Sequence, residues 1–180
     1  MATSLRAETA SLVRLSERDL ARLWQLVANG AAAGEALHDL LPAIVREYGA
    51  AGAAMAAEFY DLRREEAGAR GHYFAEPIPA DDRGAHALIG SALARAKDDD
   101  GLKRLILGGI QRRIADHVRL TTANNSVRDP ASQGWVRTLD ADGCKSGWCD
   151  QYVDGEVRTV EGYDFDAHDF CKCDVETVFW

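Results

Sequence analysis

Cysteine is absent from the first 143 residues of this 180-residue chain, and four cysteines lie in the last 37. A chain of this length can bury roughly 70% of its unfolded surface, so the cysteine-free part needs no covalent or metal staple to fold. The sequence also lacks the run of about 18 apolar residues that a membrane span requires. Its first residues do not show the apolar core and small-residue cleavage site of a secretory signal. We therefore expect no membrane contact and folding in a reducing cytoplasm, where clustered cysteines bind metal more often than they form disulfides.

Positive charge is scarce in the last third of the chain. Residues 121–180 contain 5 Lys and Arg against 12 Asp and Glu, which accounts for −7 of the total net charge of −8. Because nucleic-acid affinity comes largely from Lys and Arg, this acidity argues against nonspecific phosphate binding. The exception is a basic run at 103–119, in which Asp116 is the only acid. We interpret this run as the solvated face of a helix, with a contact to DNA or to an acidic partner as the alternative.

Helical patterns dominate residues 1–122, for which we predict a body of about four helices. Ser16 has the position of an N-cap ahead of an apolar stripe with helical spacing. A second helix is expected from about Glu35. Pro42 predicts a kink or a restart within it, because proline lacks the N–H that an interior turn uses.

The second pair of predicted helices follows a linker at 68–83, which is rich in Gly, Pro and adjacent acids. The third helix is expected at about 84–97. The fourth begins after three aspartates at 98–100, whose negative charge suits a helix N-terminus. It carries an apolar stripe that we interpret as core, formed by Leu102, Leu105, Ile106, Ile110, Ile114 and Val118.

The character of the sequence changes after Thr121, and we predict a small, loop-rich module at 123–180. Asn, Asp, Gly and Ser turn signals recur there, beginning with Asn124, Asn125 and Ser126. The short runs between them are predicted strands, at 134–139, 151–153 and 175–180. The predicted fold class is therefore α+β, mostly α, with a helical body at 1–122 and a module of short strands at 123–180.

Five residues with metal-ligating side chains lie in this module, in the pattern C-x4-C followed by H-x2-C-x-C. They are Cys144, Cys149, His168, Cys171 and Cys173. Zinc takes about four such ligands in a tetrahedron, commonly supplied as two pairs close in sequence. We therefore predict a structural zinc site of four thiolates, or of three thiolates and one imidazole. A disulfide between Cys144 and Cys149, or thiols that bind no metal, are the alternatives.

A catalytic role for the same residues is the weaker hypothesis. Cys144 or Cys149 could form a nucleophile–base pair with His168, but Cys and His in a zinc-like cluster are more often structural. Serine chemistry has no support, because no serine lies in a G-x-S-x-G turn. We assign no catalytic residue and no organic cofactor. The serines near acidic residues are Ser126, Ser132 and Ser146, and the remaining histidines, interpreted as surface or helix-packing residues, are His38, His72, His86 and His117.

Several short motifs in the last third occur together in a known family. Asp129-Pro130 precedes Gly134-Trp135-Val136-Arg137, and the first cysteine pair surrounds Gly147-Trp148. His168-Asp169-x-Cys171-x-Cys173 and Val175-Glu176-x-Val178-Phe179 follow. With these motifs, residues 125–180 resemble the C-terminal region of phage head morphogenesis proteins of the MuF-like minor capsid class. The resemblance is strongest to actinobacteriophage relatives, which are often labelled capsid maturation proteases. The family usually has C-x2-C where this chain has C-x4-C.

The resemblance implies a virion protein that is made in the cytoplasm of a bacterial host and incorporated at few copies. It would lie in the capsid interior near the portal and act in head assembly or genome delivery. The implied partners are the portal protein and/or the major capsid protein, with packaged DNA as a further candidate and no small-molecule substrate. One alternative is a capsid maturation protease, after the label of the relatives. The other is a zinc-bearing nucleic-acid-binding module, for which the basic run at 103–119 is the only support.

Overall fold

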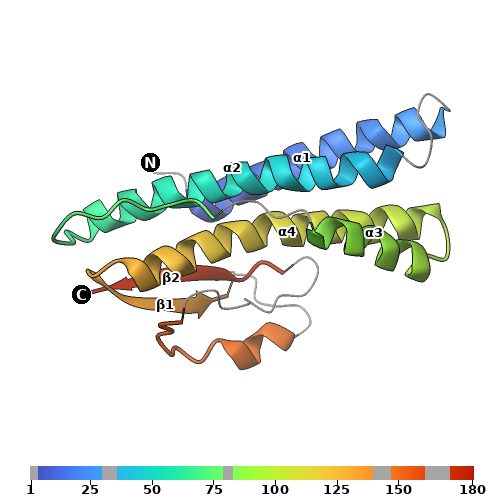
Figure 1. The fold of residues 1–180 in the computed structure, drawn as a ribbon. Helices are drawn as coiled ribbons and strands as arrows, with labels where there is room; N and C mark the ends of the chain where they lie inside the picture. Colours follow the sequence, from blue (N-terminus) through green and yellow to red (C-terminus); the bar gives the residue numbers. More distant parts are fainter. Residues whose placement is uncertain (1–3, 30–35, 79–82, 140–146, 161–170) are drawn as a thin grey trace.

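In the computed structural model, the described residues form four α-helices, a short 3-10 helix and a small two-stranded sheet (Figure 1). The structure describes residues 4–29, 36–78, 83–139, 147–160 and 171–180. The elements are α1 (Leu5–Ala28), α2 (Ala36–Glu66), α3 (Arg83–Arg95), α4 (Asp99–Arg128), β1 (Ser132–Thr138), the 3-10 helix η1 (Trp148–Tyr152) and β2 (Asp174–Phe179). The predicted fold class, α+β and mostly α, is confirmed. No helix within the described ranges is long and apolar enough to cross a membrane.

Helix α1 begins well before the predicted N-cap. Ser4 is the N-cap, and its hydroxyl accepts a hydrogen bond from the N–H of Ala7 at 3.3 Å. Ser16 instead lies inside the helix, fully buried, and its hydroxyl donates to the carbonyl of Val13 at 2.8 Å. The prediction of Ser16 as an N-cap is therefore wrong, because the helix itself satisfies this hydroxyl.

Helix α2 continues through Pro42, so of the two predicted outcomes the restart is wrong and the kink stays a prediction. Leu41 and Val45, on either side of the proline along the helix, are both buried in the core. This burial compensates for the hydrogen bond that the proline cannot make, because most helical stability in proteins comes from packing.

Helix α4 extends past the predicted turn at Asn124, Asn125 and Ser126, and the turn prediction is wrong. The hydroxyl of Ser126 donates to the carbonyl of Thr122 at 2.8 Å. The side-chain oxygen of Asn125 accepts from the hydroxyl of Tyr73 at 2.7 Å, and its amide group donates to the carbonyl of Thr121 at 2.7 Å. Asn125 and Ser126 remain helical because their side chains find partners within the helix, in the segment at 67–78 or on β2.

The helices enclose the larger of two apolar cores. It contains buried residues from all four helices, and the predicted stripe of α4 contributes Ile106, Ile110 and Ile114. Leu102 and Leu105 pack against this core from the first turns of α4. The interpretation of the stripe as core is confirmed.

The sheet lies against the other half of α4 and forms the second core. β1 and β2 are antiparallel, with Trp135 opposite Thr177. The buried residues of this core are Ala123, Trp135, Cys149, Cys173 and Val175. The strands predicted at 134–139 and 175–180 are confirmed. The strand predicted at 151–153 is wrong, because η1 occupies residues up to Tyr152 and Val153 caps it.

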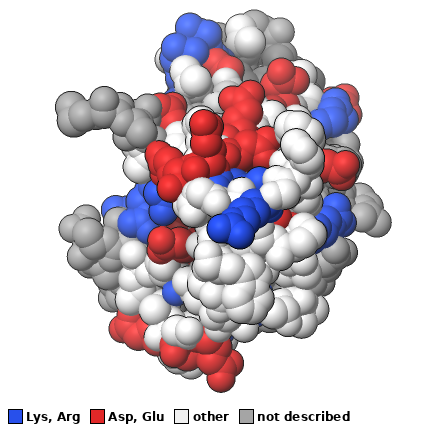
Figure 2. Space-filling view, turned by 90° about the vertical axis from the view of Figure 1, so that its left-hand side faces the viewer, with Lys and Arg blue, Asp and Glu red and all other residues white. Residues whose placement is uncertain are grey.

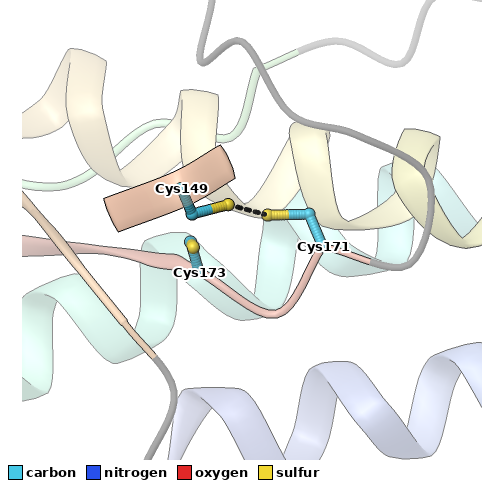
Figure 3. A group of neighbouring side chains, drawn as sticks. All are labelled: Cys149, Cys171 and Cys173. Atoms are coloured by element: carbon cyan, nitrogen blue, oxygen red, sulfur yellow. Dashed lines mark hydrogen bonds between the residues drawn. The ribbon is translucent and has the colours of Figure 1, made fainter. Parts of the chain in front are cut away.

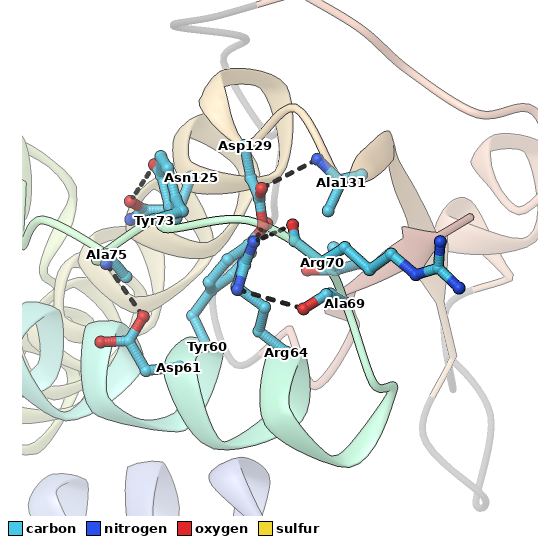
Figure 4. Close-up of polar contacts among 12 residues, drawn as sticks. Tyr60, Asp61, Arg64, Ala69, Arg70, Tyr73, Ala75, Asn125, Asp129 and Ala131 are labelled. Atoms are coloured by element: carbon cyan, nitrogen blue, oxygen red, sulfur yellow. Dashed lines mark hydrogen bonds and ion pairs between the residues drawn. The ribbon is translucent and has the colours of Figure 1, made fainter.

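A polar cluster around Asp129 fastens the end of α2 to the end of α4 (Figure 4). The buried carboxylate of Asp129 pairs with the guanidinium of Arg64 at 2.8 Å and accepts from the hydroxyl of Tyr60 at 3.2 Å. It also accepts from the N–H of Ala131 at 2.9 Å, which turns the chain from α4 into β1. Asp129, which belongs to the motif Asp129-Pro130, therefore positions the sheet against the helices.

Candidate metal centre

Three of the predicted metal ligands converge beside the sheet (Figure 3). Cys149 belongs to η1. Cys173 is the residue directly before β2, and Cys171 lies two residues earlier. Their sulfur atoms all lie within 4.8 Å of one another, and those of Cys149 and Cys171 are 3.6 Å apart. Two thiolates on one tetrahedral zinc ion lie roughly 3.8 Å apart, because each Zn–S bond is about 2.3 Å long. A disulfide would need about 2.05 Å. The cluster of Cys149, Cys171 and Cys173, called here the thiol cluster, therefore has the spacing of a metal site.

Burial distinguishes the three thiols. Cys149 and Cys173 are buried in the second core, whereas Cys171 is partly exposed. Cys171 and Cys173 also line a groove between α1 and α4. An ion would reach the thiol cluster from this side.

Arg119 of α4 holds the C-x-C segment in place. Its Nε donates to the carbonyl of Cys173 at 2.9 Å, and its Nη2 donates to the carbonyl of Cys171 at 2.8 Å. Asp116, one turn earlier, pairs with the same guanidinium at 3.2 Å. Because a guanidinium is planar and rigid, this fork fixes the relative position of the two cysteines from a single helix position.

A second buried arginine contacts the cluster from β1. Arg137 approaches the sulfur of Cys149 with its Nη2 at 3.7 Å, and its guanidinium lies over the ring of Tyr152. Arg119 and Arg137 are each less than 5% exposed. Two buried positive charges beside three thiols favour the thiolate form, which is the form that binds metal.

The pKa values of the Cys171 and Cys173 thiols are shifted in opposite directions. A hydrogen bond from the Cys173 thiol, reinforced by the charge of Arg119, lowers the pKa of Cys171 to about 4. The same hydrogen bond, together with burial, raises the pKa of Cys173. These opposite shifts favour the thiolate form at Cys171 and the thiol form at Cys173, and metal binding would displace the protons that remain.

The structure brings together Cys149, Cys171 and Cys173 of the predicted ligand set. Cys144 and His168, the other two, lie outside the described residues. Sequence analysis did not find Arg119 or Arg137 as partners of the cluster. The sequence carries little signal for the contact between Arg119 and Cys171, because the two residues are 52 positions apart along the chain.

The basic run at 103–119 is not uniformly a solvated face. Arg119 is buried, so the interpretation is wrong at this position. Lys103 pairs with Asp100 at 3.6 Å, and Arg112 pairs with Asp116 at 3.6 Å. Figure 2 shows the end of the molecule where α2 and α4 end, away from the start of this run, and there Lys and Arg side chains lie among Asp and Glu side chains. A broad positive patch is absent from that face.

Ser126 and Ser132, the two candidate serines that the structure describes, make contacts that stabilise the fold. Ser126 is buried, and its hydroxyl lies 2.7 Å from that of Thr177 on β2. The hydroxyl of Ser132 contacts the carbonyls of Gly134 and Val178, both at 3.2 Å. Ser146 lies outside the described residues. The histidine that packs most tightly is His117, which is buried on α4 against Gly49 of α2, in agreement with its interpretation as a helix-packing residue.

Fold and cluster together define a mostly helical α+β protein with a three-thiol cluster that could hold a metal ion. Comparison with family models matches residues 1–179 to the family described as VG15 protein. The chain therefore belongs to the VG15 protein family, which makes it a phage protein. Neither the curated proteins nor the solved structures contain a significant match to the chain.

Proposed function

We propose that the chain is a bacteriophage minor capsid (head morphogenesis) protein with a structural role at the inner face of the head near the portal. The family supports a phage origin, and the motifs of residues 125–180 support the narrower class. The observation that carries the structural role is the burial of two of the three thiols, Cys149 and Cys173. Both lie in the second core, where Cys149 joins η1 to the sheet.

The thiol cluster is proposed to bind one structural zinc ion. Soft thiolate ligands select zinc, copper(I) and iron–sulfur clusters among biological metals, and zinc is the one that commonly staples small modules. Cys149, Cys171 and Cys173 would supply three ligands. The fourth is proposed to be Cys144 or His168, which lie close in sequence to η1 and β2 respectively. Such a closed site has no open position for a catalytic water.

The zinc proposal is tested by metal analysis of the purified protein combined with counting of reactive thiols. We expect about one zinc per chain and thiols that react only after a chelator is added. Fully reactive thiols and no bound metal would contradict the proposal. Separate Cys144→Ser and His168→Ala variants identify the fourth ligand, because only the ligand's loss lowers the zinc content.

The capsid role is tested in particles of the phage that encodes the chain. Quantitative mass spectrometry of purified procapsids and virions is expected to find the chain at far fewer copies than the major capsid protein. Its absence from both kinds of particle would remove the proposal.

Co-expression with the major capsid protein separates this role from that of a maturation protease. We expect the capsid protein to keep its intact mass. A cleaved capsid protein that becomes intact again in Cys149→Ala or His168→Ala, but not in Ser132→Ala, would establish the protease instead.

A further inference from the structure

The outer edges of β1 and β2 differ in how many of their main-chain N–H and C=O groups already have hydrogen-bond partners. On the outer edge of β1, the N–H of Trp135 donates to the carbonyl of Arg158 at 3.0 Å. The N–H of Arg158 donates back to the carbonyl of Trp135 at 2.8 Å. Both main-chain groups of Trp135 therefore face away from β2. In an antiparallel ladder, hydrogen-bonded pairs alternate with pairs that exchange no hydrogen bond, so Trp135 and Thr177 form a pair of the second kind.

The same alternation fixes the direction of the main chain along β2. Thr177 directs its N–H and its C=O away from β1, as does Val175, and the N–H of Phe179 points the same way. The N–H of Trp180 donates to the carbonyl of Ala131 at 3.2 Å, toward the β1 side, as this alternation requires. The N–H of Val175 is satisfied by the carboxylate of Asp174 at 2.9 Å, and the C=O of Phe179 accepts from the side-chain amide of Gln133 at 3.3 Å. Within the part of the chain that the structure describes, the outward groups that remain without a partner are both groups of Thr177, the C=O of Val175 and the N–H of Phe179. This is the set that one added strand would pair.

A groove of about 450 Å³ runs along this outer edge of β2. Its opposite wall comes from α2, where Ala56, Phe59 and Leu62 line it beside the charged side chains of Arg63 and Glu66, and the first turn of α1 closes one end. Leu62 lies in the last two turns of α2 and is 54% exposed although it is a large apolar residue. The groove therefore combines a row of main-chain hydrogen-bonding groups with a facing wall that exposes apolar side chains.

We propose that this groove receives an extended segment of another protein of the same phage, which adds a third strand to the sheet at β2. An unpaired strand edge is a template for pairing with another chain, and in such complexes the main chain supplies affinity while alternate side chains enter pockets. The segment would place apolar side chains against Phe59 and Leu62. The expectation that its source is a virion protein rests on the proposed function.

The chemistry of the groove favours a polypeptide over other ligands. The alternating donors and acceptors of Val175, Thr177 and Phe179 match the repeat of a peptide backbone. A nucleic acid offers no such repeat, and the groove is lined by acidic side chains, Asp174 and Glu176 among them, as well as by Arg6 and Arg63, so its charge does not select phosphate groups.

The test uses overlapping 15-residue peptides that tile every protein encoded by the phage, probed with the full-length chain. Thr177→Pro removes the outward N–H without removing a bond of the β1–β2 ladder. Thr177→Val is its matched control, since it keeps the N–H and loses only the hydroxyl that faces Ser126. Leu62→Asp changes the exposed wall of the groove and leaves the strand untouched.

We expect at least one peptide to bind the native chain, and Thr177→Pro and Leu62→Asp to weaken that binding at least tenfold. Thr177→Val should bind within about twofold of the native chain. If Thr177→Pro fails to fold, Leu62→Asp still decides the question. Binding by no peptide, or binding that survives Leu62→Asp, would overturn the inference. Because the peptides cover all phage proteins, this result is independent of whether the chain is found in virions.

Discussion

Single side chains couple the thiol cluster to the helices, and Arg119 is the clearest case. Its guanidinium bridges the carbonyls of Cys171 and Cys173 from the middle of α4. Residues that position metal ligands in this way commonly contribute 10–100-fold to metal affinity. Arg119 is thus a positioning residue for the proposed zinc site, although it would not touch the ion.

Replacement of this arginine tests its role. Arg119→Met keeps the bulk of the side chain but loses both hydrogen bonds and the charge, so we expect zinc affinity to fall about 10–100-fold. Competition with a chromophoric chelator measures the affinity. Arg112→Met is the control, because Arg112 lies on the same helix and pairs with Asp116 without contacting a cysteine carbonyl. Equal affinities for the two variants would show that Arg119 does not position the ligands.

Tyr73 provides a residue-scale test by pH. Burial, and next the negative charge of Asp129, raise the pKa of Tyr73 to about 12. The folded state therefore favours the neutral phenol, and its stabilising contribution is complete below pH 10, where the unfolded tyrosine begins to ionise. We expect stability to fall as the pH rises from about 10 to 12. Urea unfolding at pH 9 and pH 11 measures the loss, which should be smaller in Tyr73→Phe than in the native chain.

At the scale of secondary structure, the contact between β1 and Arg158 depends on a glycine in β1. Gly134 has φ = 129°, and a Cβ at this position would lie 2.3 Å from the carbonyl oxygen of Arg158. The bridge between Trp135 and Arg158 that covers the outer edge of β1 thus depends on a residue without a side chain.

Two alanine substitutions with opposite expected signs test this dependence. Gly134→Ala is expected to destabilise the fold by about 1–3 kcal/mol, because it imposes backbone strain and a steric clash. Gly90→Ala, on an exposed face of α3 where a Cβ meets nothing within 4 Å, should stabilise by about 0.5–1 kcal/mol through helix propensity. Thermal or urea unfolding of both variants gives the comparison. A Gly134→Ala variant as stable as the native chain would refute the close contact.

Element types were largely predictable from the sequence, whereas several ends and partners were not. The apolar stripe of α4 and the strands at 134–139 and 175–180 follow from local spacing. Ser16, Asn125 and Ser126 were misread because their side chains look like cap or turn residues when considered alone. Asn125 is instead satisfied by Tyr73, 52 residues away along the chain. Such a partner follows from the packing of the segment at 67–78 on α4 and leaves no local signal.

The candidate site shows the same division. The sequence predicted five candidate ligands without distinguishing among them, and the structure brings Cys149, Cys171 and Cys173 together. The two buried arginines beside them could not be predicted, because each reaches the cluster from a different element. Charge balance around a metal site depends on tertiary structure that the ligand spacing does not encode.

The whole molecule has two cores that share one helix. α4 packs against α1, α2 and α3 and also against β1 and β2. The predicted boundary between residues 122 and 123 falls inside this helix. The larger core contains no cysteine, whereas the smaller core includes two of the thiols.

Removal of the proposed metal tests how far the two cores are independent. Because ligand binding and folding are coupled in small metal modules, a chelator should increase amide hydrogen exchange in η1 and β2. Exchange in α2 and the first half of α4 should change little, since their core does not involve the thiols. Hydrogen-exchange mass spectrometry with and without chelator measures both. Equal acceleration in all elements would mean that the two cores unfold as one unit.

The shared helix also limits how related chains could be recombined. A chimera joined at residue 122 would keep each core within one parent, because the buried residues of the larger core end at Ile114 and those of the smaller core begin at Ala123. It would instead separate Arg119 from the cysteine carbonyls that it binds, and Arg64 from Asp129. A junction at 67–78 would keep Arg119 with these carbonyls but would divide the larger core between the two parents, because α2 and α4 both contribute to it. A working hybrid of this protein should therefore need matched residues at whichever of these contacts its junction divides.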